Sequence, residues 1–212
     1  MGHPSRADLE AAVADIDASP ADHGRVELIV CRPAVDERTE LAEAVLDEEA
    51  GLVGDDWARR ASARKAGAGP DGERQVTVMN ARVARAVAGG TGGWSQAGDQ
   101  LYVDLDLGVA NLAAGTRLVV GTAVLEVTAE PHLGCAKFAR RFGREALAFV
   151  NSAPGRRGRR RGLNARVVRG GRVRVGDPVR KQPGGEQAWA GPSTPEPGEG
   201  VVDGSHAAGA RH

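Results

Sequence analysis

The sequence predicts a mainly β domain that closes, or nearly closes, into a barrel with a few short peripheral helices. At least six short segments rich in valine and leucine are separated by glycine-containing turns, a pattern typical of small barrels. The segments with helical periodicity are few and short, and they do not alternate regularly with the strands. This order argues against a nucleotide-binding α/β fold and favours a β-barrel-like core.

The chain of 212 residues is long enough for one domain with irregular ends. Residues 1–24 carry a thin apolar face at helical spacing, so we expect an N-terminal helical appendage. Residues 25–181 are expected to form the barrel. Residues 182–212 are rich in Gly, Pro, Ser and Glu and are expected to be a disordered tail. The chain lacks a signal-peptide pattern and any apolar run near the roughly 18–20 residues that span a bilayer, so we expect a cytoplasmic protein without a membrane partner.

The first half of the barrel region is expected to contain three strands and two short helices. Apolar runs and alternation predict strands at 26–31, 75–79 and 98–105, the last half-exposed, and helical spacing predicts helices at 38–47 and 81–88. Glycines bracket Asp55, a pattern typical of a tight turn whose carboxylate accepts backbone N–H groups. Cys31 falls in the first strand, where a small buried hydrophobe is the favoured interpretation.

The second half is expected to contain two hairpins and one longer helix. Gly121-Thr122 separates strands at 117–120 and 123–128, which fits a two-residue hairpin. From Lys137 to about Asn151 the apolar residues follow helical spacing, with a basic opposite face. Gly170-Gly171 lies between strands at 163–168 and 172–175 and predicts a second hairpin.

The formal net charge is zero, but the charges are distributed unevenly. Residues 1–56 hold 15 acidic and 4 basic residues, whereas residues 137–181 hold 15 basic and 2 acidic residues. The arginine-rich run at 156–162 is expected to be either a solvated or disordered loop or an anion site, since arginine recognises phosphate with two parallel hydrogen bonds. Aromatic residues make up only 3% of the chain, which weighs against single-stranded nucleic-acid binding.

Cys135 lies where the strand before it stops and the basic helix begins. A thiol acts as a nucleophile or a metal ligand only as thiolate, and its pKa of about 8.5 is lowered by a helix N-terminus and by nearby cations. Lys137, Arg140 and Arg141 lie within about one turn, and His132 lies three residues upstream. One cysteine and one histidine are too few for a zinc site. The alternative is a buried capping cysteine beside a surface histidine.

Six segments of the chain occur in an order that resembles stand-alone bacterial MOSC-domain proteins. They include the glycines around Asp55, Gly98-Asp99-Gln100 and the segment around Cys135. The matching segments are 51–55, 75–80, 98–101, 116–127, 131–138 and 161–177. MOSC domains also form the C-terminal part of molybdenum cofactor sulfurases. The resemblance covers roughly residues 25–181 and departs from many relatives at Asp99-Gln100, where they carry Glu-Asn.

The resemblance implies a β-barrel-like domain with a site for the molybdenum cofactor, molybdopterin. The family cysteine corresponds to Cys135, which would carry sulfur as a persulfide or ligate molybdenum. The basic segment from Lys137 to Arg166 would attract the pterin phosphate. We expect the following residues to bind the cofactor: His132, Lys137, Arg141, Arg161, Asn164 and Arg166.

The same resemblance implies partners. The chain has no pyridoxal-phosphate domain of the cysteine desulfurase type, so persulfide formation at Cys135 would need a sulfur donor such as a cysteine desulfurase. A molybdoenzyme would be the acceptor. Whether the chain is an enzyme stays open between a sulfurtransferase-like activity and a component of a molybdenum-dependent oxidoreductase.

Two other classes of protein stay open. In a nucleic-acid- or protein-binding barrel, the arginine-rich run would contact the partner and Cys135 would have no catalytic role. In a plain interaction module the barrel would have no reactive site. The sparse aromatic residues and the thiol at a helix start favour the sulfur or molybdenum hypothesis and make nucleic acid the less favoured partner.

Overall fold

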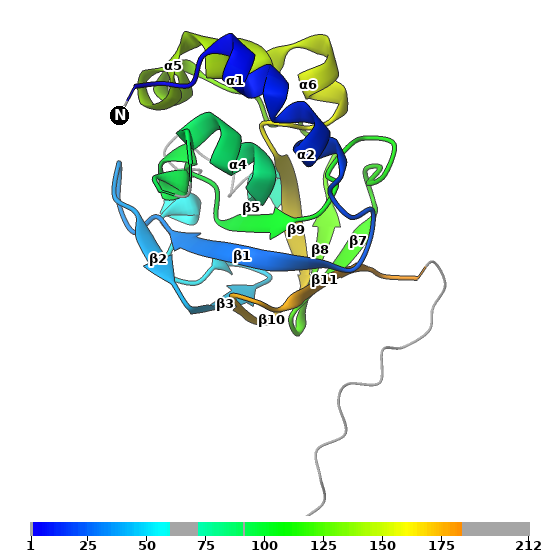
Figure 1. Cartoon of the computed structure of the whole chain (residues 1–212). Helices are drawn as coiled ribbons and strands as arrows, with labels where there is room; N and C mark the ends of the chain where they lie inside the picture. The colour runs from blue at the N-terminus through cyan, green and yellow to red at the C-terminus, as the bar shows by residue number, and fades with distance from the viewer. Residues whose placement is uncertain (1, 60–71, 91, 184–212) are drawn as a thin grey trace, which may run out of the picture. The chain divides into compact units, whose positions relative to one another are not determined.

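A closed β-barrel forms the centre of the computed structural model, which describes residues 2–59, 72–90 and 92–183 (Figure 1). Within these residues the barrel strands follow the order β11-β7-β8-β9-β5-β6-β1, and β11 also pairs with β1 to close the ring. The bounds are β1 (Gly24–Cys31), β5 (Val76–Asn80), β6 (Leu101–Asp104), β7 (Arg117–Val120), β8 (Ala123–Val127), β9 (Leu163–Arg169) and β11 (Pro178–Lys181). The predicted β-barrel is therefore confirmed.

Most neighbouring strands run antiparallel, and β5 and β6 form a parallel pair. The ring closes where Gly24 of β1 lies opposite Val179 of β11. The other end of the same β1 edge pairs with the short strand β2 (Thr39–Leu41). A separate sheet of three strands, β3 (Glu43–Asp47), β4 (Gly51–Leu52) and β10 (Gly171–Arg174), packs against the barrel core through Leu46.

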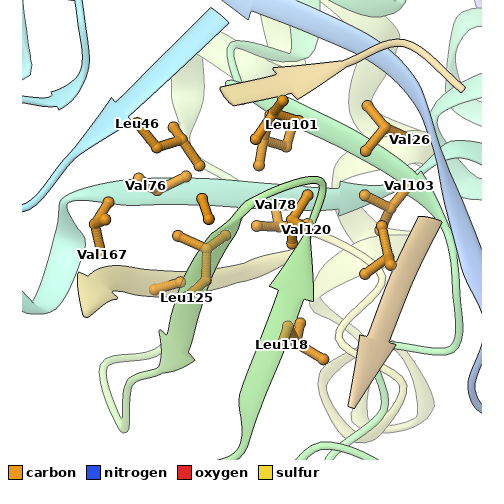
Figure 2. Close-up of a cluster of buried hydrophobic side chains, with 14 of the residues drawn as sticks. Val26, Leu46, Val76, Val78, Leu101, Val103, Leu118, Val120, Leu125 and Val167 are labelled. Carbon is orange, nitrogen blue, oxygen red and sulfur yellow. The ribbon is translucent and has the colours of Figure 1, made fainter. Parts of the chain in front are cut away.

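The barrel interior is filled by aliphatic side chains that alternate along the strands (Figure 2). Successive strand residues point to opposite faces, so alternate residues enter this core, except in β1, where a register shift between Val26 and Leu28 interrupts the alternation. In β6, Leu101 and Val103 belong to the barrel core, whereas Tyr102 belongs to a second cluster under the helices. The prediction of a half-exposed strand at 98–105 is therefore wrong, because β6 is covered on both faces.

Helices cover one side of the barrel (Figure 1). They are α1 (Arg6–Ala11), α2 (Val13–Asp17), α4 (Ala81–Ala88), α5 (Ala136–Asn151) and α6 (Ala153–Arg157), with short 3-10 helices η1 (Gly72–Arg74) and η2 (Trp94–Ala97). The helix predicted from Lys137 and the one predicted at 81–88 are confirmed. Phe138 and Phe142 of α5 are buried against Met79 and Tyr102 of the barrel wall.

The N-terminal helices pack onto α4 and α5. Ser5 caps α1 by accepting a hydrogen bond from the Asp8 N–H, and the Asp8 carboxylate accepts one from the Ser5 N–H in return. Leu9 is 1% exposed and Ile16 is 7% exposed, so both contribute to the cluster under the helices. This segment belongs to the same compact unit as the barrel strands.

Two predicted elements are wrong for reasons that lie in tertiary packing. The residues of the predicted helix at 38–47 form β2 and β3, in which Ala44 and Leu46 alternate toward the core. The predicted hairpin around Gly170-Gly171 does not form, because β9 pairs with β5 and β8 whereas β10 pairs with β3. Gly171 passes so close to Thr122 that a Cβ atom there would lie 2.6 Å from its carbonyl carbon.

Two sequence-based expectations concern the ends of the chain and the membrane. From residue 184 onward, the predicted disordered tail at 182–212 lies outside the described residues. In the part of the chain that the structure describes, no helix combines the length and the hydropathy needed to cross a bilayer.

Candidate functional site

A cavity of about 600 Å³ opens beside the start of α5. The β1–β2 connection, η2, the loop at 130–135 and the start of β9 supply its walls. Its lining combines basic, polar and apolar side chains: Arg32, Arg38, Trp57, Arg74, Thr77, Ala97, Gly98, Glu130, Pro131, His132, Leu133, Cys135, Lys137, Phe138, Arg141, Arg161 and Asn164. All the predicted site residues except Arg166 are therefore brought together.

Cys135 is the N-cap residue of α5 and is exposed at this cavity. The loop before it is held by Asn151 at the far end of α5. The Asn151 side chain accepts a hydrogen bond from the Gly134 N–H at 2.9 Å and donates one to the Gly134 carbonyl at 3.0 Å. A Cβ atom on Gly134 would lie 2.7 Å from Leu147, so glycine lets the loop approach α5 this closely.

Asn151 can reach Gly134 because α5 is broken at Gly143. This residue has φ 90° and ψ 167°, a conformation that is essentially restricted to glycine, and the two halves of the helix meet there at a kink. The second half then turns back toward the loop that carries Cys135. His3 packs against the kink, where a Cβ atom on Gly143 would lie 2.9 Å from its side chain.

The surroundings of Cys135 lower the pKa of its thiol. Partial burial alone would raise the pKa. The N–H groups of Phe138 and Lys137 in the first helical turn and the positive charges of Arg161 and Arg141 outweigh burial. The Cys135 side chain makes no capping hydrogen bond that meets the usual geometric limits. The prediction that the helix N-terminus and Arg141 lower the pKa of the Cys135 thiol agrees with this geometry.

We expect iodoacetamide at pH 7 to label Cys135 more than about tenfold faster than Cys31, because only the thiolate reacts. Burial raises the pKa of Cys31, whose side chain belongs to the barrel core, whereas the pKa of Cys135 is lowered. Mass spectrometry of digested protein, with Cys135→Ser as control, measures both rates. Slow labelling at an equal rate on the two cysteines would contradict this expectation.

Three guanidinium groups converge on Gly98 at the cavity wall. Arg32 donates a hydrogen bond to the Gly98 carbonyl at 2.8 Å. A Cβ atom on Gly98 would lie 3.2 Å from Arg38 Nη2 and 3.7 Å from Arg141 Nη1. Gly98 has φ 88°, a left-handed conformation that glycine adopts without strain. Its lack of a side chain also leaves room for the guanidinium groups beside it. This concentration of charge suits a multiply charged oxyanion.

Arg32 is fixed in place by Asp55. The two side chains form two parallel hydrogen bonds of 2.8 and 2.9 Å, and the Asp55 side chain is 0% exposed. Asp55 also accepts hydrogen bonds from the N–H groups of Arg32 and Trp57. The predicted tight turn with a carboxylate that accepts backbone N–H groups is confirmed, and it additionally orients a cation of the site.

Arg161 enters the cavity from the turn before β9 and is 7% exposed. It forms an ion pair of 2.6 Å with the fully buried Asp99, donates to the Ala97 carbonyl at 3.0 Å and lies over the Phe138 ring at 5.1 Å. Burial would raise the pKa of Asp99, but Arg161 and His132 outweigh it and hold the pKa below its usual range.

The remaining arginines of the run at 156–162 do not reach this cavity. Arg159 donates to the Leu112 carbonyl at 2.5 Å, and burial lowers its pKa. Arg160 is 9% exposed and lies over the Phe149 ring at 4.4 Å. The run starts in α6 and continues in tight turns, so it is not a disordered loop. The prediction of a solvated segment holds for Arg156 and Arg157, which are exposed, but not for Arg160 and Arg161, which are buried.

Lys137 and Arg141 share one acidic neighbour, Asp36 of the β1–β2 connection. The Asp36 carboxylate lies 2.7 Å from Arg141 and 3.6 Å from Lys137. Asp36 has φ 62°, a left-handed conformation that is uncommon outside glycine. One exposed carboxylate therefore offsets about half of the charge of two cations that line the cavity.

Asn164 and Arg166 both belong to β9 but lie in different surroundings. Asn164 is 2% exposed, lines the cavity and donates to the Glu130 carbonyl at 3.1 Å. Arg166 lies opposite Glu126 of β8 and pairs with its carboxylate at 2.5 Å. It does not line the cavity.

Sequence reasoning missed Asp99 and the basic residues Arg32, Arg38 and Arg74 as parts of the site. The three arginines come from segments that only the closed fold brings near Cys135. Asp99 had a signal, because it lies in one of the segments that resemble the family. No group of three or more histidine, cysteine, aspartate or glutamate side chains able to hold a metal occurs in the described ranges.

The fold and this cavity define a β-barrel domain with an exposed cysteine beside a cluster of basic side chains. A model of the MOSC domain matches residues 65–180, more than half of the chain. The chain therefore belongs to the MOSC-domain family. A comparison with the curated proteins finds no match.

Solved structures with the same fold include three bacterial proteins. YuaD of Bacillus subtilis is 17% identical with a TM-score of 0.56, over 74% of this chain and 93% of YuaD. YiiM of Escherichia coli is 17% identical with a TM-score of 0.50, over 74% of this chain and 69% of YiiM. YiiM of Geobacillus stearothermophilus is 15% identical with a TM-score of 0.51, over 75% of each chain. At these identities the likeness concerns the fold.

Proposed function

We propose that Cys135 carries sulfur as a persulfide, in a cavity that accepts an anionic cofactor of the molybdopterin class. The observation that carries this proposal is the placement of an exposed thiol with a lowered pKa on the same cavity as six basic side chains. These are Arg32, Arg38, Arg74, Lys137, Arg141 and Arg161. Glu130 is the one carboxylate among the described lining residues, and it pairs with Arg74.

The residues present fit such a cofactor. Arg32, Arg38 and Arg141 converge on one wall and would hold its phosphate through charge-assisted hydrogen bonds. Thiolate is a soft ligand suited to redox-active metals, so Cys135 is the side chain that would meet the molybdenum. When bound, the cofactor would supply the redox and sulfur chemistry of molybdenum. The protein itself would bind the phosphate, orient the cofactor and present the thiolate.

Two partners belong to this proposal. A sulfur donor such as a cysteine desulfurase would load Cys135, and a molybdoenzyme would receive the sulfur or the cofactor. The nucleic-acid alternative loses part of its support, because Arg160 and Arg161 of the arginine-rich run are buried and only Arg156 and Arg157 of the run are exposed. Sulfurtransferase-like chemistry is therefore the activity to test first.

The test is sulfur loading from a small hydropersulfide. We expect incubation with glutathione hydropersulfide, followed by removal of the donor, to add about 32 Da, the mass of one sulfur atom, at Cys135. Cys135→Ser should remove the added mass, whereas Cys31→Ser should retain it, because Cys31 is buried. Mass spectrometry of the intact and digested protein measures the adduct. Loading at Cys31 alone, or at neither cysteine, would refute the sulfur-carrier function.

A second experiment probes the oxyanion site without the cofactor. We expect Asp36→Ala to tighten binding of inorganic pyrophosphate by about three- to tenfold, because Lys137 and Arg141 lose their shared counter-charge. Glu37→Ala is the matched control, since it removes a neighbouring acid from the same segment. Isothermal titration calorimetry measures both affinities. Equal affinities of the Asp36→Ala variant and the wild type would show that pyrophosphate does not use these two cations.

A further inference from the structure

His132 and Asp99 form a hydrogen-bonded pair at the wall of the cavity. His132 Nε2 lies 2.8 Å from Asp99 Oδ1, and the other carboxylate oxygen of Asp99 lies 2.6 Å from Arg161. The Asp99 side chain is 0% exposed, and its ionised carboxylate can only accept hydrogen bonds. Nε2 of His132 must therefore carry the proton, and Asp99 selects this tautomer.

The tautomer leaves Nδ1 of His132 as an unprotonated acceptor. The ring edge with Nε2 and Cδ2 faces Asp99 and Gly162, since a Cβ atom on Gly162 would lie 3.2 Å from Cδ2. The opposite edge carries Nδ1, and within the described residues no group forms a hydrogen bond with it. The His132 side chain is 18% exposed and lines the same cavity as Cys135.

Burial and the charge of Arg161 favour the neutral form of this imidazole. Burial lowers the pKa of His132, and the positive charge of Arg161 lowers it further, whereas Asp99 acts in the opposite direction. A neutral imidazole can take a proton and give it back, which an imidazolium held permanently charged could not do.

We propose that His132 is the acid–base residue of Cys135 chemistry and that Asp99 is the positioning residue that aims its Nδ1 at the cavity. This proposal rests on the proposed sulfur-carrier function and adds the proton path to it. His132 and Asp99 would thus act in proton transfer, a role separate from binding an anionic ligand.

The sulfur donor in this reaction is a hydropersulfide, R–S–SH. The Cys135 thiol gives its proton to Nδ1 of His132, directly or through one water molecule. The Cys135 sulfur then forms a bond with the terminal sulfur of the donor, and the S–S bond of the donor breaks. The leaving thiolate R–S⁻ takes the proton from Nδ1 and departs as R–SH. No electron is gained or lost overall, and His132 ends neutral.

This role predicts a dependence on the leaving group. An alkyl thiolate is strongly basic and leaves faster when it is protonated, whereas an aromatic thiolate such as that of 5,5′-dithiobis(2-nitrobenzoate) leaves without a proton. We expect His132→Ala to slow sulfur transfer from glutathione hydropersulfide by about 10²-fold and to slow reaction with the aromatic disulfide by less than about threefold. Stopped-flow measurement at pH 7 in a Cys31→Ser background assigns both rates to Cys135.

Two further variants and a chemical rescue complete the experiment. Asp99→Asn should reproduce the same selective loss, because its amide can donate to Nε2 and favours the wrong tautomer. Added imidazole should restore part of the alkyl-donor rate of His132→Ala. His23→Ala, at an exposed histidine outside the cavity, should leave both rates unchanged. If circular dichroism shows that Asp99→Asn does not fold, the comparison of the two donors in His132→Ala alone decides whether His132 has the proposed role.

No slowing with the hydropersulfide would overturn the role of His132. Equal slowing with both donors would overturn its role as the acid that protonates the leaving thiolate, because only the alkyl thiolate needs that proton. The proposed function fails separately, if the wild type takes no sulfur from the hydropersulfide. The rate with oxidised glutathione, whose leaving thiolate also needs a proton, then decides the inference by the same comparison. Loss of that rate in His132→Ala with an intact aromatic-disulfide rate supports it, and an unchanged rate refutes it.

Discussion

Replacing Asp55 with alanine is expected to destabilise the domain by about 3–5 kcal/mol, since removing one partner of a buried ion pair leaves the other charge uncompensated. Arg32 and Asp55 are 8% and 0% exposed, and Asp55 also accepts two backbone N–H groups. The freed Arg32 should also lose its place against Gly98. Urea unfolding and pyrophosphate titration measure the two effects.

The control for Asp55→Ala is Glu10→Ala, which removes the carboxylate of an exposed pair with Arg6. This control should leave both stability and pyrophosphate affinity unchanged. A stable Asp55→Ala protein with wild-type pyrophosphate affinity would show that Arg32 does not depend on Asp55 and that the cation cluster assembles without it.

Gly143→Ala is expected to cost about 1–3 kcal/mol for the backbone conformation alone, and more because the new methyl group would meet His3. The kink also sets the place of Asn151, which holds Gly134 beside Cys135. Iodoacetamide labelling of Cys135 should therefore change together with thermal stability. Differential scanning fluorimetry and mass spectrometry measure the two quantities on the same samples.

Gly158→Ala is the matched glycine control. Gly158 has φ −80°, and a Cβ atom there would lie no closer than 3.4 Å to a neighbouring atom, so alanine fits. Its melting temperature and its labelling rate should match those of the wild type. If Gly143→Ala behaved like Gly158→Ala, the break in α5 would have no role in holding the cysteine loop.

The barrel and the place of Cys135 were predictable because their signals are local. The Gly121-Thr122 turn pairs β7 with β8 over adjacent residues, and the N-terminus of α5 falls directly after Cys135. The strand β3 was not predictable in the same way. Leu41, Ala44 and Val45 fit a helical spacing, and only packing of Ala44 and Leu46 against the barrel selects a strand.

The candidate site was predictable only where it lies close to Cys135 in sequence or in strand order. Arg166 was predicted as a site residue, and it lies on the same face of β9 as Asn164. It lies opposite Glu126, however, and forms an ion pair with it, outside the cavity. Arg32 follows β1, and its role depends on a turn 23 residues further along the chain. Pairings of this kind arise from the closed barrel and leave no periodic pattern in the sequence.

The closure of the ring between β1 and β11 constrains how the protein is made. Gly24 and Arg25 pair with Val179 and Pro178, so the first barrel strand receives its last partner only after the chain has been synthesised past Val179. Until then β1 and β7 present unpaired edges, which are the usual sites of intermolecular strand association. Contacts so distant in sequence also slow folding. A ribosome-bound or truncated chain that stops before Pro178 would therefore expose two unpaired strand edges, which the short strand β11 covers in the folded protein.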